Sequence, residues 1–260
     1  MACVKGRVMD EKTRRDVDML REWIETCPKG RMVFFGGAGV STESGIPDFR
    51  SPTGLYGAAR AKTYEYSPEY MCSRTFFDGH TPEFFGFYTD RMLYLDAQPN
   101  RAHAKLAELE RRGILDAVVT QNIDGLHQAA GSKNVFELHG SVLRNYCNRC
   151  ERFYDVRQML AAREASEGGV PRCECGGVIK PDVVLYEEPL DEHVMEGALR
   201  AIAKADLLLI AGTSLAVYPA AGLIDYFKGS HVAIVNMSTT GRDRMADACI
   251  SASIGDVLGY

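Results

Sequence analysis

The 260-residue sequence contains no long hydrophobic run, no low-complexity tract and no repeat at a fixed period. No stretch approaches the ~18 apolar residues of a membrane-spanning helix, and the first residues lack the apolar segment of a signal peptide. We therefore expect a cytoplasmic protein with no membrane association. Neither sign of charge dominates, since 30 Lys and Arg stand against 35 Asp and Glu, for a formal net charge of −5. Direct binding to nucleic acid needs a basic surface and is not expected.

What is present is the composition of an ordinary folded protein, with 46% hydrophobic residues, 25 Gly and 10 Pro. At ~100–200 residues per domain, the length favours one large domain that carries insertions. Such a chain buries enough apolar surface to fold without disulfides. The eight cysteines are therefore interpreted as thiols or metal ligands in a reducing compartment.

Alternating helical and strand-like patterns indicate how the chain is organised. An apolar stripe at helical spacing covers residues 14–27, and continuous apolar runs follow at 31–35, 117–120, 207–211 and 232–235. Continuous apolar strands separated by helices predict a parallel sheet covered on both faces. We predict a single α/β domain over 1–260, with a doubly wound Rossmann-like sheet. The expected large lobe comprises about 1–52, 96–142 and 183–260, and the insertions comprise about 53–95, taken as helical, and 143–182.

A glycine-rich loop, residues 36–42 (GGAGVST), follows the first predicted strand. Gly37 and Gly39 fit the dinucleotide fingerprint G-x-G-x-x-G, whereas Thr42 stands where the third glycine would be. Two more strand ends, at 211–215 and 235–240, carry small and polar residues. The carboxyl ends of parallel strands form the edge at which nucleotides bind. A tight turn without a ligand is the alternative for this loop alone.

Four cysteines form two pairs with the spacing C-x2-C-x22-C-x-C, namely Cys147, Cys150, Cys173 and Cys175. This spacing is close to that of a zinc ribbon, although the second pair has one intervening residue where two are usual. The glycines at 176–177 allow the backbone to curl around an ion. Four thiolates complete a tetrahedral Zn²⁺ site, so we predict one structural zinc in the insertion 143–182, with catalysis elsewhere.

His139 is the strongest candidate for a catalytic base, because it ends a strand-like run just before the cysteine-bearing insertion. Imidazole, with a pKa near ~6.5, can accept a proton from a hydroxyl at neutral pH. Residues 120–124 (TQNID) bring Asn122 and Asp124 to the same predicted edge, and residues 44–50 (SGIPDFR) follow the glycine-rich loop. Each segment taken singly is also compatible with an ordinary polar loop.

In combination, these motifs resemble the sirtuins, a family of NAD-dependent protein-lysine deacylases. The resemblance covers nearly the whole chain. It rests on 37–50 (GAGVSTESGIPDFR), 120–124, the dipeptide at 139–140, both cysteine pairs, 212–214 (GTS) and 235–236 (VN).

The resemblance implies an enzyme, an NAD-dependent protein-lysine deacetylase with NAD and one structural Zn²⁺ as cofactors. In the family's reaction the acyl-lysine carbonyl oxygen attacks the anomeric carbon of the nicotinamide ribose and nicotinamide leaves. A base then activates a ribose hydroxyl that captures the acyl group. The products are free lysine, nicotinamide and O-acyl-ADP-ribose. Acyl-lysine proteins or peptides are the implied partners, and a monomer is favoured.

The resemblance also assigns roles to individual residues. His139 would be the general base, and Asn122 and Asp124 would share in catalysis through the nicotinamide pocket. The full set implied to contact NAD is Gly37, Ala38, Gly39, Thr42, Ile46, Phe49, Arg50, Gln121, Asn122, Ile123, Asp124, His139, Gly212, Thr213, Ser214, Asn236, Asp256 and Val257. Of these, Ala38 and Thr42 would lie on the phosphates and ribose. Thr213, Ser214, Asn236, Asp256 and Val257 would hold the adenosine half.

Residues 180–188 (KPDVVLYEE) resemble the segment that pairs its backbone with the substrate peptide, a mode of recognition that accepts many sequences. By this match Val184 would contact the acyl-lysine. The chain departs from the commoner pattern at Tyr186, where Phe is usual, and at Glu187, where Gly is usual. Peptide preference is therefore left open.

Tyr88 and Arg91 have the Tyr-x-x-Arg spacing that binds an acyl carboxylate in the family's desuccinylating members. On a helix the two side chains share a face and can pair with such an anion. An aromatic packed in the helical insertion beside a solvated Arg is the favoured interpretation, so deacetylation stands first. A desuccinylase and a protein ADP-ribosyltransferase are the alternatives. An NAD-dependent dehydrogenase and a zinc-dependent nucleic-acid-binding module explain fewer of the motifs.

Overall fold

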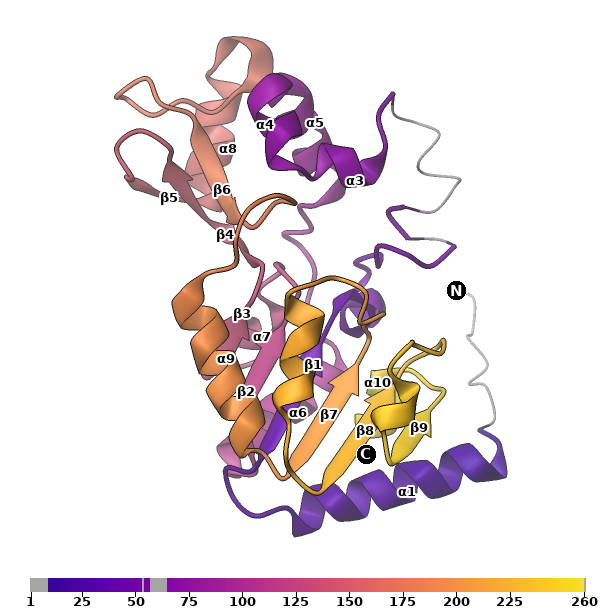
Figure 1. Cartoon of the computed structure of the whole chain (residues 1–260). Helices are drawn as coiled ribbons and strands as arrows, with labels where there is room; N and C mark the ends of the chain where they lie inside the picture. The colour runs from indigo at the N-terminus through magenta and orange to yellow at the C-terminus, as the bar shows by residue number, and fades with distance from the viewer. Residues whose placement is uncertain (1–8, 53, 57–64, 260) are drawn as a thin grey trace.

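The protein is described by a computed structural model over residues 9–52, 54–56 and 65–259. Its centre is a six-stranded, fully parallel sheet with the order β3-β2-β1-β7-β8-β9 (Figure 1). The strands are β1 (Met32–Gly36), β2 (Leu115–Thr120), β3 (Val135–Glu137), β7 (Leu207–Ala211), β8 (His231–Val235) and β9 (Ala248–Ile250). The chain adds strands to one side of β1 and later to the other, so the strand order reverses between β1 and β7. Nucleotides bind at such a reversal in open α/β sheets.

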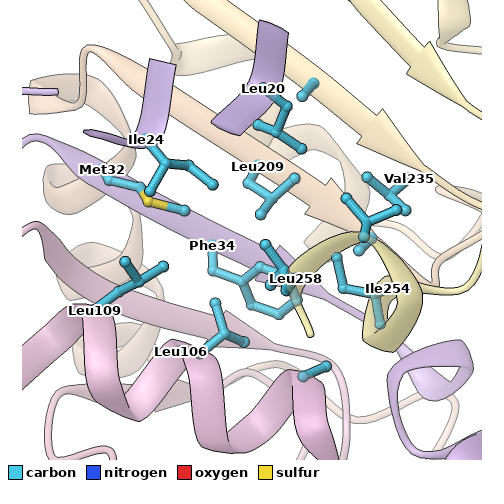
Figure 2. Packing of buried hydrophobic residues seen from close by; sticks show 14 of the residues in the cluster. Leu20, Ile24, Met32, Phe34, Leu106, Leu109, Leu209, Val235, Ile254 and Leu258 are labelled. Carbon is cyan, nitrogen blue, oxygen red and sulfur yellow. The ribbon is translucent and has the colours of Figure 1, made fainter. Parts of the chain in front are cut away.

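Helices cover both faces of this sheet, and each face has its own hydrophobic core. On one face lie α1 (Glu11–Thr26), α6 (Arg101–Arg111) and α10 (Ile254–Leu258), which pack on Met32 and Phe34 of β1 (Figure 2). On the other lie α9 (Glu192–Lys204) and the 3-10 segment η4 (Ala220–Tyr226), which pack on Val33 and Phe35. Because successive side chains alternate between two buried faces, every residue of β1 and β7 is buried.

The two insertions together form a small lobe above the carboxyl edge of the sheet (Figure 1). It contains an antiparallel sheet, β5-β4-β6, and several short helices. Its elements are α3 (Pro68–Met71), α4 (Arg74–Gly79), α5 (Thr81–Arg91), β4 (Gly140–Cys147), β5 (Phe153–Asp155), α8 (Val156–Glu164), η3 (Glu167–Gly169) and β6 (Ile179–Val183). Phe76 and Phe84 from the helices share one core with Cys147, Cys173 and Ile179. Neither insertion therefore has a core of its own.

The predicted α/β fold class is confirmed. The expected strands at 31–35, 117–120, 207–211 and 232–235 are found within two residues, and the helix expected over 14–27 is found within three. Neither α9 nor β9 was predicted from the sequence. The loop after β1 also differs from a simple turn, because it forms the 3-10 turns η1 (Ala38–Val40) and η2 (Thr42–Ser44). Part of the expected helical insertion, residues 53 and 57–64, lies outside the described residues. No helix in the described part of the chain is long and apolar enough to cross a membrane.

Candidate active site

A cavity of about 800 Å³ lies where the carboxyl edge of the parallel sheet meets the small lobe. Its walls come from the loops after β1, β2, β7 and β8 and from residues 183–188, which follow β6. Most residues singled out from the sequence line it, although they come from segments up to 200 positions apart. They are Ala38, Gly39, Thr42, Ile46, Phe49, Arg50, Gln121, Asn122, Ile123, Asp124, His139, Val184, Gly212, Thr213, Ser214, Asn236 and Arg91.

The glycines after β1 allow two loops to touch. The Gly37 N–H donates to the Ala211 carbonyl (3.1 Å) and the Gly39 N–H donates to the Gly212 carbonyl (2.8 Å). A Cβ on Gly39 would stand 2.7 Å from the Gly212 Cα, too close for any side chain. Because both N–H groups already have carbonyl partners, those of Gly37 and Gly39 are not free to bind a phosphate. These glycines serve close packing, and Gly37 is not among the residues that line the cavity.

Ser41, Asn122 and Asp124 form a hydrogen-bonded triplet at the floor of the cavity. The Ser41 hydroxyl donates to Asp124 Oδ2 (2.6 Å) and accepts from Asn122 Nδ2 (3.1 Å). Asp124 Oδ1 also accepts from the Leu126 N–H (2.9 Å), at the start of α7 (Leu126–Ala129). Ser41 is fully buried. The two side chains expected to act in the nicotinamide pocket are thus fixed relative to each other by a third.

Gln121, Thr213 and Asn236 join the ends of three strands. Gln121 Oε1 accepts from the Thr213 hydroxyl (2.8 Å), and Asn236 exchanges two hydrogen bonds with the Thr213 backbone (2.9 and 3.1 Å). The Gln121 amide nitrogen is buried and has no hydrogen-bond partner among the described residues. An unpaired buried donor is costly unless a ligand satisfies it. This donor therefore fits a ligand that offers hydroxyl oxygens, as the riboses of NAD do.

His139 lies between β3 and β4, where the two lobes join. Its Nδ1 makes a hydrogen bond with the Gln121 carbonyl (3.0 Å). Since a carbonyl can only accept, Nδ1 carries the hydrogen and Nε2 is left as the proton acceptor. Burial lowers the pKa of His139 below its usual value, although the Gln121 carbonyl opposes this shift. The ring is therefore neutral at physiological pH, the state that a general base requires.

Two residues expected on the adenosine half of NAD do not reach the cavity. The Val257 side chain is fully buried in the core beneath α10, and Asp256 pairs with Arg101 (2.8 Å). Residues 252–254, one turn earlier, line the cavity instead. The start of α10, and not its middle, therefore faces the cavity at the sheet edge.

Tyr88 and Arg91 are not brought together at the cavity. Arg91 lines it and pairs with Asp90 (2.7 Å), whereas Tyr88 is fully buried and stacks on Phe84. The Tyr88 hydroxyl has no hydrogen-bond partner among the described residues. The structure therefore contains Tyr88 as an aromatic packed in the helical insertion, which was the favoured interpretation.

Two residues that position the site were not singled out from the sequence as site residues. Ser41 stands between Gly39 and Thr42, and no local sequence signal distinguishes it from an ordinary serine in a glycine-rich loop. Asn100 is the N-cap of α6. Its side-chain amide also donates to the Val40 carbonyl (2.8 Å) and to the Ser44 hydroxyl (3.1 Å). Asn100 thereby holds the loop that carries Ser41.

The four predicted cysteine ligands meet in the small lobe. Their sulfur atoms all lie within 4.8 Å of one another, with Cys147 and Cys175 at 3.4 Å and Cys150 and Cys173 at 3.6 Å. A Cβ on Gly177 would lie 2.6 Å from the Cys147 sulfur, so the second knuckle closes because glycine follows it. The set fits one tetrahedral Zn²⁺, which thiolates bind at about 2.3 Å. None of the four lines the cavity.

Comparison with known proteins gives concordant matches. A model of the Sir2 family matches residues 37–219. An NAD-dependent protein deacetylase of Clostridium perfringens is 55% identical over 253 residues, which cover 96% of this chain and 98% of the relative. A solved structure of Sir2 with a p53 peptide and NAD+ has a TM-score of 0.83 at 36% identity and covers 94% of this chain and 95% of its own. A Sir2 protein bound to a propionylated peptide has a TM-score of 0.82 at 34% identity, covering 94% and 95%.

Proposed function

The chain belongs to the Sir2 family, and we propose that its cavity performs NAD-dependent deacetylation of lysine in protein or peptide substrates. One observation carries the proposal. A neutral His139 with an available Nε2, the unpaired amide of Gln121 and the Ser41, Asn122 and Asp124 triplet all line or border one cavity. This combination provides a base, a donor for ribose hydroxyls and a polar pocket next to each other.

When bound, NAD supplies the ribose carbon that accepts the acyl oxygen and the nicotinamide that leaves. Within the chain, the Gln121 amide would bind a ribose hydroxyl, and His139 Nε2 would accept the proton of the hydroxyl that captures the acyl group. The hydrogen bond from Nδ1 to the Gln121 carbonyl holds the imidazole in the required tautomer and stabilises it once it is protonated. Gln121 would thus orient the ribose through its side chain and the base through its carbonyl.

The remaining polar and aromatic residues of the cavity would orient NAD and exclude water. Asn122, Asp124 and Ile46 would surround nicotinamide, with the amide and carboxylate held through Ser41. Phe49 contacts the edge of the Tyr56 ring, with ring centres 5.4 Å apart, and the Arg50 guanidinium lies 5.8 Å from the same ring. This aromatic cover would shield the reacting ribose, since cleavage of a glycosidic bond needs a shielded pocket and a positioned nucleophile.

Ala38 and Thr42 would lie beside the phosphates, and Thr213, Ser214 and Asn236 would hold the adenosine half, assisted by residues 252–254. Val184 would contact the acyl-lysine. The four cysteines would hold one structural Zn²⁺ away from the chemistry. We retain a single catalytic domain, a monomer and a cytoplasmic location as working hypotheses. The net charge of −5 favours basic protein segments over nucleic acid as partners.

The decisive experiment is mass spectrometry of the products formed from NAD and acetyl-, succinyl- and longer-acyl-lysine peptides. We expect equal amounts of nicotinamide, free-lysine peptide and O-acetyl-ADP-ribose, with acetyl-lysine the preferred substrate. ADP-ribosylated protein without O-acyl-ADP-ribose would favour the transferase alternative. Absorbance of reduced nicotinamide would indicate a dehydrogenase.

A further inference from the structure

Glu187 occupies a backbone conformation in which glycine is usual. Its φ is 77°, and it is the third residue of a turn closed by a hydrogen bond from the Glu188 N–H to the Leu185 carbonyl (3.0 Å). A positive φ at the third position alone is the mark of a type II β-turn, which favours glycine or asparagine there. A glutamate in this position is strained by its Cβ. Other contacts must therefore hold it.

The Glu187 side chain supplies such contacts by binding the first turn of α4. Its Oε2 accepts from the Thr75 N–H (2.8 Å) and from the Thr75 hydroxyl (2.7 Å). The Thr75 N–H is one of the backbone donors that a helix cannot satisfy internally at its start. Both partners of Glu187 are thus on one residue, in the helical part of the small lobe.

The residues on either side of Glu187 are fixed to the same helical part. The Tyr186 N–H donates to the Cys72 carbonyl (2.9 Å), and the Tyr186 carbonyl accepts from the Arg74 N–H (3.0 Å). The Glu188 carboxylate accepts from Lys180 (3.1 Å) and Arg74 (3.2 Å). The turn is therefore anchored on one side by backbone pairing and on the other by an ion-pair network.

Unlike the peptide groups of Tyr186, the N–H and carbonyl of Glu187 make no hydrogen bond with any described residue. Glu187 also lines the cavity, as does Val184. Its side chain is therefore engaged with the protein, while its peptide groups remain available at the wall where a substrate would lie.

We propose that Glu187 is a positioning residue for the substrate peptide. Its carboxylate, held by Thr75, fixes the turn so that the Glu187 N–H and carbonyl meet the backbone beside the acyl-lysine. This inference rests on the proposed deacetylase function and on the peptide-pairing role that the resemblance implies for residues 180–188.

A glycine at this position would adopt the same φ without strain but would leave the turn unanchored. Apparent affinity falls in proportion to the fraction of molecules in the binding-competent conformation. The anchor should therefore affect the KM for the peptide while leaving the binding of NAD unchanged, because the residues proposed to hold NAD come from the loops after β1, β2, β7 and β8.

The test measures steady-state kinetics and melting temperature for the wild type and for Glu187→Gly, Glu187→Gln and Thr75→Ala. The matched control is Glu192→Gln, which removes the same charge from an exposed position at the start of α9. The substrates are an acetyl-lysine peptide and the same peptide N-methylated at the residues flanking the acetyl-lysine. N-methylation removes the N–H groups that would pair with the turn.

For Glu187→Gly we expect the peptide KM to rise about tenfold, the factor that corresponds to losing one good hydrogen bond, with the KM for NAD unchanged. Glu187→Gln keeps an oxygen that can accept from Thr75, and Thr75→Ala keeps the backbone donor, so both should show a smaller rise. N-methylation should raise KM in the wild type and have less effect in Glu187→Gly.

An unchanged peptide KM in Glu187→Gly would overturn the inference, as would an equal rise in the KM for NAD. Fully additive effects of N-methylation and Glu187→Gly would also contradict it. A lower melting temperature with unchanged KM would make Glu187 merely structural. The wild type and Glu192→Gln report on the proposed function separately. If these two proteins deacetylate the peptide, failure of the inference leaves the function intact, and if neither does, both proposals fail.

Discussion

The two lobes that enclose the cavity are stabilised in different ways. In the large lobe every residue of β1 and β7 is buried, and apolar side chains fill both faces of the sheet. In the small lobe only alternate residues of β6 are buried. Its elements are also linked by ion pairs and by the cysteine cluster, as when Arg144 of β4 bonds Asp182 of β6 (2.8 Å).

This difference has a functional consequence. The large lobe presents the loops proposed to bind NAD on a sheet whose two faces are packed with apolar side chains. The small lobe presents the segment proposed to bind the peptide on a scaffold whose core includes two of the four cysteines, Cys147 and Cys173. Loss of the metal should therefore first disturb the wall of the cavity formed by residues 183–188.

Removal of zinc should have the largest effect. A chelator is expected to abolish amide protection in β4 and β6 and to eliminate deacetylation, because structural zinc contributes about 10–16 kcal/mol of binding energy in small zinc modules. Protection of β1 and β7 should persist. Hydrogen exchange read by mass spectrometry compares the four strands in one experiment. Equal protection in all four after complete metal removal would show that both lobes are stable without the ion.

Substitution of the base should come next in size. His139→Ala is expected to lower kcat for deacetylation by about 10²–10⁴, the usual contribution of a general base. The melting temperature should change little, because the ring makes a single hydrogen bond to the protein. His193→Ala, an exposed histidine on α9, is the matched control and should behave as wild type. Full deacetylation by His139→Ala would refute the assignment.

The sequence predicts the features that depend on local patterns and misses those that depend on contacts between distant segments. The strands at 31–35 and 207–211 were predictable because a buried parallel strand is a continuous apolar run, and the cysteine spacing predicted the metal site. The contact between Glu187 and Thr75 joins residues 112 positions apart, and no local pattern encodes it. The same reason applies to Ser41, because a serine beside glycines is common and its partners Asn122 and Asp124 lie 81 and 83 positions away.

A smaller effect is expected in the pH dependence of kcat/KM, which reports on His139 at the junction between the lobes. Burial lowers the pKa of His139 from its usual value near 6.5. The neutral ring is the active form, so activity falls only when the pH drops below this lowered pKa. The acid limb of kcat/KM should therefore have its midpoint below 6.5.

Melting temperatures measured over the same pH range separate this titration from acid unfolding. A midpoint at or above 6.5 in a protein that remains folded would mean that the ring is not desolvated as the structure has it.

The smallest change is expected for Arg91→Ala, which tests whether the small lobe selects the acyl group by charge. A carboxylate site of the Tyr-x-x-Arg type needs the phenol and the guanidinium together, but Tyr88 is fully buried against Phe84 and only Arg91 lines the cavity. The wild type should prefer acetyl- over succinyl-lysine, and Arg91→Ala should change the ratio of the two kcat/KM values by less than about threefold, a difference below about 0.7 kcal/mol. A tenfold selective loss of desuccinylation would require Tyr88 to leave its aromatic core when substrate binds, and the small lobe would then be the more adaptable of the two.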